Sequence, residues 1–196
     1  LVWKVFENYQ TLMKENQIRD INTAMYECTK LLQASGKKAI YANIIIDEGQ
    51  DFSDNAYRLI RALAGEEHSN DIFIVGDAHQ RIYRNHPTLS KCGINIRGRS
   101  SILKINYRTT EEIRKHAFAL LNSVSFDDMD GDIDLGDKCQ SLTHGEEPIL
   151  KGFANANEEF EYILSEVRRL EDNGVSLTDI CVVARTKNLV DDYISL

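Results

Sequence analysis

Short apolar runs alternate with longer amphipathic stretches along the 196 residues of this chain. The runs "IYANIII" at 40–46, "DIFIVGD" at 71–77 and "ILKIN" at 102–106 predict strands. Two later runs, "PILKGF" at 148–153 and "DICVVAR" at 179–185, predict two more. The strand at 40–46 is apolar on both faces, which is typical of strands buried in a parallel sheet, and the strands at 71–77 and 179–185 are also expected to be buried.

Between these runs, apolar residues recur at the spacing of a helix. Residues 3–16 predict a first helix. A second helix is expected to begin at its capping residue Asp20, to run through Leu32 and to end at Gly36. Ser53 is expected to cap a third helix.

Two further helices are predicted in the second half of the chain. Thr109 with Glu112 resembles a capping box ahead of "EIRKHAFALLN". The stretch "NANEEFEYILSEVRRLEDNG" predicts an amphipathic helix that ends at Gly174. Strands and helices that alternate in this way predict an α/β fold with a doubly wound parallel sheet. The length suits one large domain or two small ones.

Polar residues occur at the ends of three of the predicted strands. They are Asp47 and Glu48 after the first strand, Gly76 and Asp77 at the end of the second, and Asn106, Tyr107 and Arg108 at the end of the third. In doubly wound sheets, ligands bind beyond the carboxyl ends of the strands. We therefore expect these three strand ends to converge at one edge.

The first of these ends, "IIIDEGQD", has the chemistry of a nucleotide-hydrolysing site. Proteins hold Mg²⁺ through one or two carboxylates together with water and substrate phosphates, so Asp47 is a candidate ligand. Glu48 can orient and deprotonate an attacking water. Gly49 allows a tight turn, and the neutral Gln50 can sense a phosphate without repelling it. The alternative is a strand-to-helix turn whose acids only cap the next helix.

The charge of the chain is unevenly distributed. The formal net charge is −8, yet residues 81–108 contain seven cations and no acid, which leaves −15 for the rest of the chain. A basic segment in an acidic chain favours an anionic partner. The alternative is that its side chains pair with acids elsewhere in the same protein.

The segment 127–137 contains six aspartates and predicts a solvated loop. Asp130, Asp132 and Asp134 have the spacing of the first three calcium ligands of an EF-hand. However, Leu135 and Ser141 stand where such a loop needs glycine and glutamate, so the sequence favours the solvated loop.

The sequence argues against several classes of protein. No apolar run approaches the ~20 residues of a membrane span. The four cysteines are far apart and form no zinc or disulfide pattern. They predict free, mostly buried thiols in the reducing cytoplasm.

Three stretches carry a resemblance to a known family. "IIIDEGQDFS", "IVGDAHQRIYR" and "LKINYRTTEEI" occur in this order and resemble motifs II, III and IV of the UvrD/Rep/PcrA-like superfamily 1 helicases. The later "EEFEYILSEVRRLEDNGVSLTDICVVAR" resembles the segment that follows motif IV. The resemblance implies partial RecA-like domains of the P-loop NTPase type. It implies the end of a first domain in 1–100 and the start of a second in 101–196, joined near 97–101.

The resemblance also implies roles for the residues at the first strand end. Asp47 and Glu48 resemble the Walker B pair of the family. The resemblance implies that both lie at the Mg²⁺ ion, that Asp47 is its ligand and that Glu48 is the catalytic base. Gln50 and Asp51 complete the family pattern of motif II.

Three other residues resemble the ATP-binding residues of the family. Gln80 resembles the motif III glutamine that senses the γ-phosphate, on a turn that Asp77 is expected to support. Tyr107 resembles the tyrosine that stacks on adenine. Arg108 resembles the arginine that reaches the γ-phosphate, where a planar guanidinium can form two parallel hydrogen bonds.

The family contacts single-stranded DNA just after motif III, where this chain has Tyr83, Arg84 and His86. The family usually has a tryptophan where this chain has Asn85, so this part of the resemblance is weaker. Single-stranded DNA is the expected partner and RNA the alternative, because ATP-site motifs do not read the sugar. A non-catalytic helicase-like module that binds nucleic acid or a protein is the second interpretation, and the intact motifs argue against it.

The sequence contains no phosphate-binding loop of the form G-x-x-x-x-G-K-[ST]. The segment "SGKK" at 35–38 lacks the first glycine and the final Ser or Thr. The family carries this loop before motif II, and motifs V and VI after the region matched here. We therefore expect this chain to be the middle of a longer helicase, to need the rest of that protein as its partner, and to be inactive alone.

Overall fold

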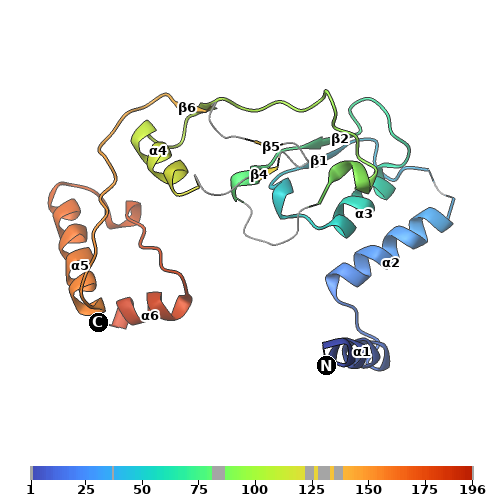
Figure 1. The fold of residues 1–196 in the computed structure, drawn as a ribbon, viewed down its shortest axis with the longest axis horizontal. Coiled ribbons are helices and arrows are strands. Elements are labelled where there is room, and N and C mark those ends of the chain that lie inside the picture. The colour runs from blue at the N-terminus through green and yellow to red at the C-terminus, as the bar shows by residue number, and fades with distance from the viewer. Residues whose placement is uncertain are drawn as a thin grey trace. The chain divides into compact units, whose positions relative to one another are not determined.

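The computed structural model describes residues 2–36, 38–80, 87–121, 126–127, 133–134 and 139–195 (Figure 1). The chain divides into two compact units, Leu1–Glu146 and Glu147–Leu196. Unit 1 contains every strand found in the described residues. Unit 2 contains helices α5 and α6.

The first two helices lie where the sequence predicts them. Helix α1 spans Val2–Glu15 and helix α2 spans Ile21–Ala34. The side chain of Asp20 accepts a hydrogen bond from the Thr23 N–H at 2.7 Å, so it caps α2 as expected. α2 ends just before Gly36, which has a φ of +60° and therefore suits the end of a helix.

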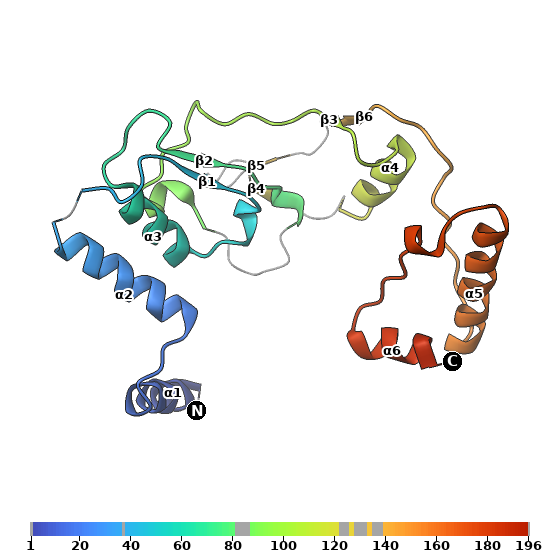
Figure 2. The same ribbon diagram turned by 180° about the vertical axis from the view of Figure 1, so that it is seen from behind.

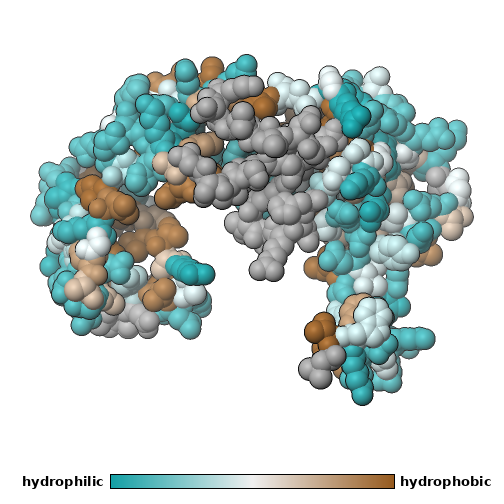
Figure 3. Space-filling view, in the orientation of Figure 1, coloured by the Kyte–Doolittle hydropathy of each residue, from teal (hydrophilic) through white to brown (hydrophobic). Residues whose placement is uncertain are grey.

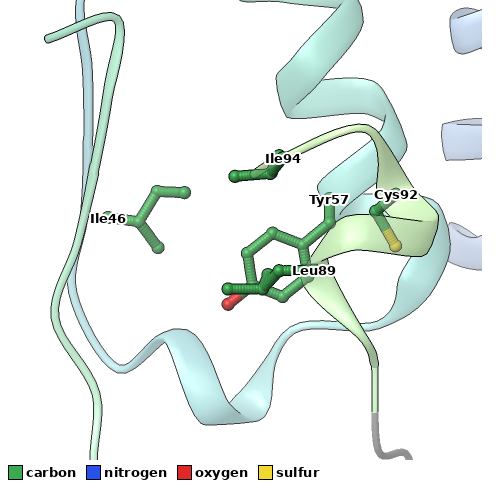
Figure 4. Packing of buried hydrophobic residues seen from close by; sticks show 5 residues of the cluster. All are labelled: Ile46, Tyr57, Leu89, Cys92 and Ile94. Atoms are coloured by element: carbon green, nitrogen blue, oxygen red, sulfur yellow. The ribbon is translucent and has the colours of Figure 1, made fainter. Parts of the chain in front are cut away.

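Helix α3 (Asp54–Ala64) packs on the strand pair β1 (Ile44–Ile46) and β2 (Ile72–Ile74), as Figures 1 and 2 show from opposite sides. The Ser53 hydroxyl accepts the Ala56 N–H at 3.3 Å, so Ser53 caps α3 as predicted. The short helix η3 (Leu89–Cys92) completes the core. Figure 4 shows the buried side chains that meet there: Ile46, Tyr57, Leu89, Cys92 and Ile94.

Strands β1 and β2 are parallel and shorter than predicted, with Ile45 opposite Phe73 in the register. Side chains that alternate along a strand point to opposite faces of the sheet. Ile46 is buried in the core beside α3, whereas Ile45 and Phe73 on the other face are 78% and 61% exposed. The prediction of burial on both faces is therefore wrong, because the described elements cover only one face of this pair.

A second parallel pair consists of β3 (Ile105–Asn106) and β6 (Gln140–Ser141). It is a sheet of its own, so β3 does not extend the β1–β2 pair. Helix α4 (Glu111–Ala119) follows β3 and is capped by Thr110, whose hydroxyl accepts the Ile113 N–H. The predicted cap at Thr109 is therefore wrong by one residue.

The aspartate-rich segment contributes an antiparallel pair, β4 (Phe126–Asp127) and β5 (Ile133–Asp134). These strands replace part of the predicted loop. The remaining residues of 127–137, including Asp130 and Asp132, lie outside the described residues, so the calcium-loop alternative stays untested.

Unit 2 is built from helix α5 (Ala156–Asp172), the short helix η4 (Leu177–Asp179) and helix α6 (Lys187–Ser195). α5 matches its prediction, with Asn155 as cap and a turn that closes at Gly174.

The two strands predicted in unit 2, at 148–153 and 179–185, are wrong. Neither segment pairs with another strand in the described part of the chain, and Val183 is 84% exposed. Figure 3 shows hydrophobic side chains at the surface of this unit. An apolar run becomes a strand only where a neighbouring strand takes its backbone hydrogen bonds.

The four cysteines are free thiols, as predicted, but only Cys92 is buried. Burial raises the pKa of the Cys92 thiol, whereas Cys28 and Cys181 are exposed. None of the helices in the described ranges is long and apolar enough to cross a membrane. The described elements form a mixed α/β fold with small parallel sheets.

Candidate active site

The turn after β1 holds the first candidate residues. Glu48 has a left-handed backbone, with φ 51° and ψ 41°, which is uncommon for a residue other than glycine. The Asp47 carboxylate accepts the Glu48 N–H at 2.9 Å and so supports this conformation. The Gly49 N–H donates to the Val75 carbonyl at 2.9 Å, which ties the turn to the end of β2.

Gly49 is required because the turn packs closely against the core. A Cβ atom here would lie 2.7 Å from a side-chain carbon of Ile74 and 2.8 Å from the Tyr57 hydroxyl. That hydroxyl donates to the Gly49 carbonyl at 2.5 Å. The buried Tyr57 of α3 therefore holds the backbone from which Glu48 projects.

Gln50 joins the two strand ends. Its Nε2 donates to the Glu48 carboxylate at 2.7 Å, and its Oε1 accepts the Asp77 N–H at 3.0 Å. Gln50 is only 3% exposed. Gly76 leaves room for this contact, because a Cβ there would lie 2.8 Å from the Gln50 Oε1. Both ends of the Gln50 amide are therefore bound within the protein, and Gln50 connects the two strand ends. The sequence suggests only that Gln50 can sense a phosphate.

Asp77 supports the turn after β2, as the sequence predicts. Its Oδ1 accepts the His79 N–H at 2.9 Å, and its Oδ2 accepts the Gln80 Nε2 at 2.9 Å. These bonds order the short helix η2 (Ala78–Gln80) and hold the Gln80 side chain beside Asp77. The structure thus brings Asp47, Glu48, Gln50 and Gln80 together at the carboxyl ends of β1 and β2.

The third predicted strand end belongs to the separate β3–β6 sheet, so the expected convergence of three ends in one sheet is not found. Asn106 orders this end, since its Oδ1 accepts the Arg108 N–H at 2.9 Å and its Nδ2 donates to the Ser141 hydroxyl at 3.2 Å. Tyr107 is 74% exposed and Arg108 is also exposed. An exposed ring can stack on a base, and an exposed guanidinium can bind phosphate.

Glu111 at the start of α4 is a residue that sequence reasoning missed. Its carboxylate accepts two hydrogen bonds from Arg114, at 2.9 and 2.6 Å, and one from the Ser141 N–H at 2.8 Å. The Arg114 bonds, followed by the Ser141 bond, lower the pKa of Glu111 to about 2. The sequence signal was an acid in the first helical turn with an arginine three residues later.

Glu112 has a similar position one residue on. Its carboxylate binds the His144 ring at 2.8 Å and accepts the Gly145 N–H at 2.9 Å. These contacts, led by the one to His144, lower the pKa of Glu112 to about 2. Glu112 therefore ties α4 to the segment after β6 and does not close a capping box.

The candidate DNA contacts Tyr83, Arg84 and His86 lie outside the described residues. Within the rest of the basic segment, Arg99 forms an ion pair with Glu67. For Arg99, the alternative prediction is therefore confirmed, namely that cations of the basic segment pair with acids of the same protein. Lys91 and Lys104 are exposed.

The residues at the end of β1 suit a magnesium ion that takes most of its ligands from water and phosphate. Asp47 is exposed, and one of its carboxylate oxygens is used by the Glu48 N–H. The described residues contain no group of three or more His, Cys, Asp or Glu side chains that could enclose a metal. This donor set fits Mg²⁺ bound together with a phosphate better than an ion held by protein alone.

The chain matches two families of helicase domains. Residues 1–86 match the UvrD/REP helicase N-terminal domain, and residues 101–194 match the UvrD-like helicase C-terminal domain. Both matches include strand ends of the site described above.

Individual relatives are distant in sequence. The ATP-dependent DNA helicase UvrD1 of Mycobacterium tuberculosis is 27% identical, over 95% of this chain and 26% of the relative. DNA helicase II of Escherichia coli is 29% identical, over 74% and 20%. The mitochondrial ATP-dependent DNA helicase HMI1 of Saccharomyces cerevisiae is 22% identical, over 94% and 27%. This chain therefore spans between a fifth and just over a quarter of the length of these curated relatives.

Proposed function

Because the chain belongs to the UvrD-type superfamily 1 DNA helicases, we propose that it supplies part of an ATP-hydrolysis site for movement along DNA. In this proposal, residues 1–100 are the end of a first RecA-like domain and residues 101–196 the start of a second. The observation that carries the proposal is the hydrogen-bonded line from Glu48 through Gln50 to Asp77, which joins two parallel strand ends.

Asp47 and Glu48 are the proposed centre of the chemistry. Asp47 would hold Mg²⁺, with Glu48 beside it, and the bound ion would neutralise charge on the phosphates. The Glu48 carboxylate would accept a proton from the attacking water. The water oxygen then bonds to the γ-phosphorus while the bond to the bridging oxygen breaks, which leaves ADP and phosphate.

The other residues of the site position groups around this centre. Gln50 would keep the Glu48 carboxylate in place, since its own amide is bound at both ends. Gln80, held by Asp77, would sense the γ-phosphate. Tyr107 and Arg108 would come from the second sheet, the first to stack on adenine and the second to bind the γ-phosphate.

We propose single-stranded DNA as the polymer, bound with help from the basic segment 81–108, with Tyr83, Arg84 and His86 as base contacts. The expected location is the cytoplasm. Binding to phosphates should weaken steeply as salt rises. RNA is the alternative polymer, and ATPase stimulation by the two polymers separates them.

The test uses the full-length gene product. We expect ATP turnover that requires Mg²⁺ and rises with single-stranded DNA, and we expect Glu48→Gln to lower kcat at least ~100-fold. Glu66→Gln is the matched control, because Glu66 is an exposed glutamate outside the site. No ATP turnover by the wild type would favour the non-catalytic module instead.

The 196 residues alone are expected to turn over no ATP, since they contain no G-x-x-x-x-G-K-[ST] loop to hold the phosphates. Turnover by this purified chain that is abolished by Glu48→Gln would contradict this expectation.

A further inference from the structure

We propose that His79 is a positioning residue that couples turn η2, which carries Gln80, to helix α4, which follows Arg108. The inference rests on the proposed function, because it assigns a partner to the turn that would sense the γ-phosphate. It concerns a side chain that the sequence motifs leave without a role.

One side of the His79 ring is fixed by Asp77. The His79 N–H donates to the Asp77 Oδ1 at 2.9 Å, and the ring Nδ1 lies 3.2 Å from the same oxygen. The side chain of His79 is only 15% exposed. The ring is therefore held by the same carboxylate that holds the Gln80 amide at 2.9 Å.

The His79 ring also contacts Phe118 on α4. The two ring centroids are 5.3 Å apart and the planes are tilted by 60°, a favourable arrangement for an aromatic pair. The Arg114 guanidinium lies over the Phe118 ring, 5.6 Å from its centroid. Phe118 thus contacts both His79 and Arg114, a cation of its own helix.

The line of contacts continues from α4 to the second sheet. Arg114 is bound in a fork by Glu111, and Glu111 accepts the Ser141 N–H of β6 at 2.8 Å. Ser141 in turn accepts a hydrogen bond from Asn106, whose Oδ1 receives the Arg108 N–H. Gln80 and Arg108 therefore lie at the two ends of one continuous set of contacts.

Histidine suits this position because it makes both contacts at once. Phenylalanine could pack on Phe118 but has no nitrogen for Asp77, and asparagine could bind Asp77 but has no ring for Phe118. A shift of the η2 turn must therefore either carry α4 with it or break the ring contact. This gives the phosphate-sensing turn a direct mechanical link to the helix behind Arg108.

The experiment measures DNA-stimulated ATP turnover of the full-length gene product. The variants are His79→Asn, His79→Phe, Phe118→Leu and the double variant His79→Asn/Phe118→Leu. We expect each single variant to lower kcat about 5- to 10-fold, with the KM for ATP within about twofold of wild type, because the coupling acts on the reaction and not on nucleotide binding. The double variant should be no slower than the worse single variant, since both break the same link.

Phe118→Tyr keeps the ring and should retain wild-type kcat, which separates loss of the contact from loss of the fold. His68→Asn is the matched control, because His68 is an exposed histidine whose ring Nδ1 lies 3.0 Å from the carbonyl of the neighbouring Ser69. Thermal unfolding of every variant is measured alongside. If the other variants unfold, the kcat values of His79→Phe and Phe118→Tyr are compared, and a loss in the first without a loss in the second supports the link.

Wild-type kcat in His79→Asn, His79→Phe and Phe118→Leu, or losses that multiply in the double variant, would overturn the inference. A change confined to KM would do the same. An inactive wild-type protein would instead refute the proposed function of the site, so the two failures are distinguishable.

Discussion

The buried ion pair between Arg61 of α3 and Asp71 gives the sharpest stability prediction. Arg61 Nη1 lies 2.6 Å from Asp71 Oδ2, and the two side chains are 14% and 6% exposed. Asp71 also accepts the His68 N–H at 3.3 Å and the Ile72 N–H at 2.8 Å, at the start of β2. The pair therefore holds α3 to the strand on which the site is built.

Arg61→Gln should leave the Asp71 carboxylate buried without its cation. Removing one partner of a buried ion pair costs about 3–5 kcal/mol. Because the two N–H bonds to Asp71 remain, we expect about 3 kcal/mol, the lower end of that range. This corresponds to a shift of roughly 150-fold in the opening equilibrium of the β1–β2 pair.

The matched control is Arg58→Gln, the same substitution one helical turn earlier. Arg58 pairs with Asp54 at 3.4 Å, but these side chains are 45% and 50% exposed. Exposed pairs contribute about 0–1 kcal/mol, so little change is expected. Hydrogen exchange of the Ile44 and Val75 amides, which bond across the strand pair, measures the opening directly.

The effect of Arg61→Gln should also depend on pH. Burial by itself raises the pKa of Asp71, but hydrogen bonds from Arg61, the His68 N–H and the Ile72 N–H outweigh it, so the pKa lies below its ordinary value. Such a group stabilises the fold above the unfolded-state pKa near ~3.9, and this stability is lost as pH falls through the lowered value.

Wild type and Arg61→Gln should therefore differ most near neutral pH and converge in acid. Equal effects of Arg61→Gln and Arg58→Gln would refute the reasoning. A difference between wild type and Arg61→Gln that stays constant from neutral to strongly acidic pH would refute it as well.

Three further predictions concern the site and its supports. Tyr57→Phe removes the 2.5 Å hydrogen bond to the buried Gly49 carbonyl, so the free energy of unfolding measured in urea should fall by about 1–3 kcal/mol. An unchanged urea midpoint with an unchanged slope of the free energy against urea would contradict this. Gly76→Ala puts a Cβ 2.8 Å from the Gln50 Oε1, so the side-chain amide resonances of Gln50 should shift and kcat of the full-length gene product should fall; unmoved resonances would contradict it. The Glu111 carboxyl, with its pKa lowered to about 2, should remain ionised at pH 3.5 in an NMR titration. The stability that this carboxylate gives should be present above the unfolded-state pKa of ~4.3 and should be lost as pH falls through about 2. A titration midpoint at the ordinary glutamate pKa would show that the Arg114 contact is absent.

The sequence predicts local features of this chain well. The caps Asp20, Ser53 and the final turn at Gly174 depend only on residues within one helical turn, and all three are confirmed. The order of β1, α3 and β2 is confirmed for the same reason, since the spacing of apolar residues is a local signal.

Features that need a distant partner are predicted poorly. The apolar runs at 148–153 and 179–185 have strand-like composition, yet no strand pairs with them in the described residues. The exposed face of β1–β2 is another case, because a composition that suits burial on both sides does not reveal which side is covered. The cap at Thr110 in place of Thr109 is a smaller error of register.

The sequence by itself determined which polar groups follow the apolar runs, because carboxylates, amides and guanidinium groups can be identified from residue order alone. Only the tertiary structure decided how these groups are connected. Gln50 binds Glu48 and Asp77 because parallel pairing brings the two strand ends together across 27 residues of sequence. His79 meets Phe118 across a still longer separation. Contacts of this kind depend on where the backbone returns, which no local pattern of residues specifies.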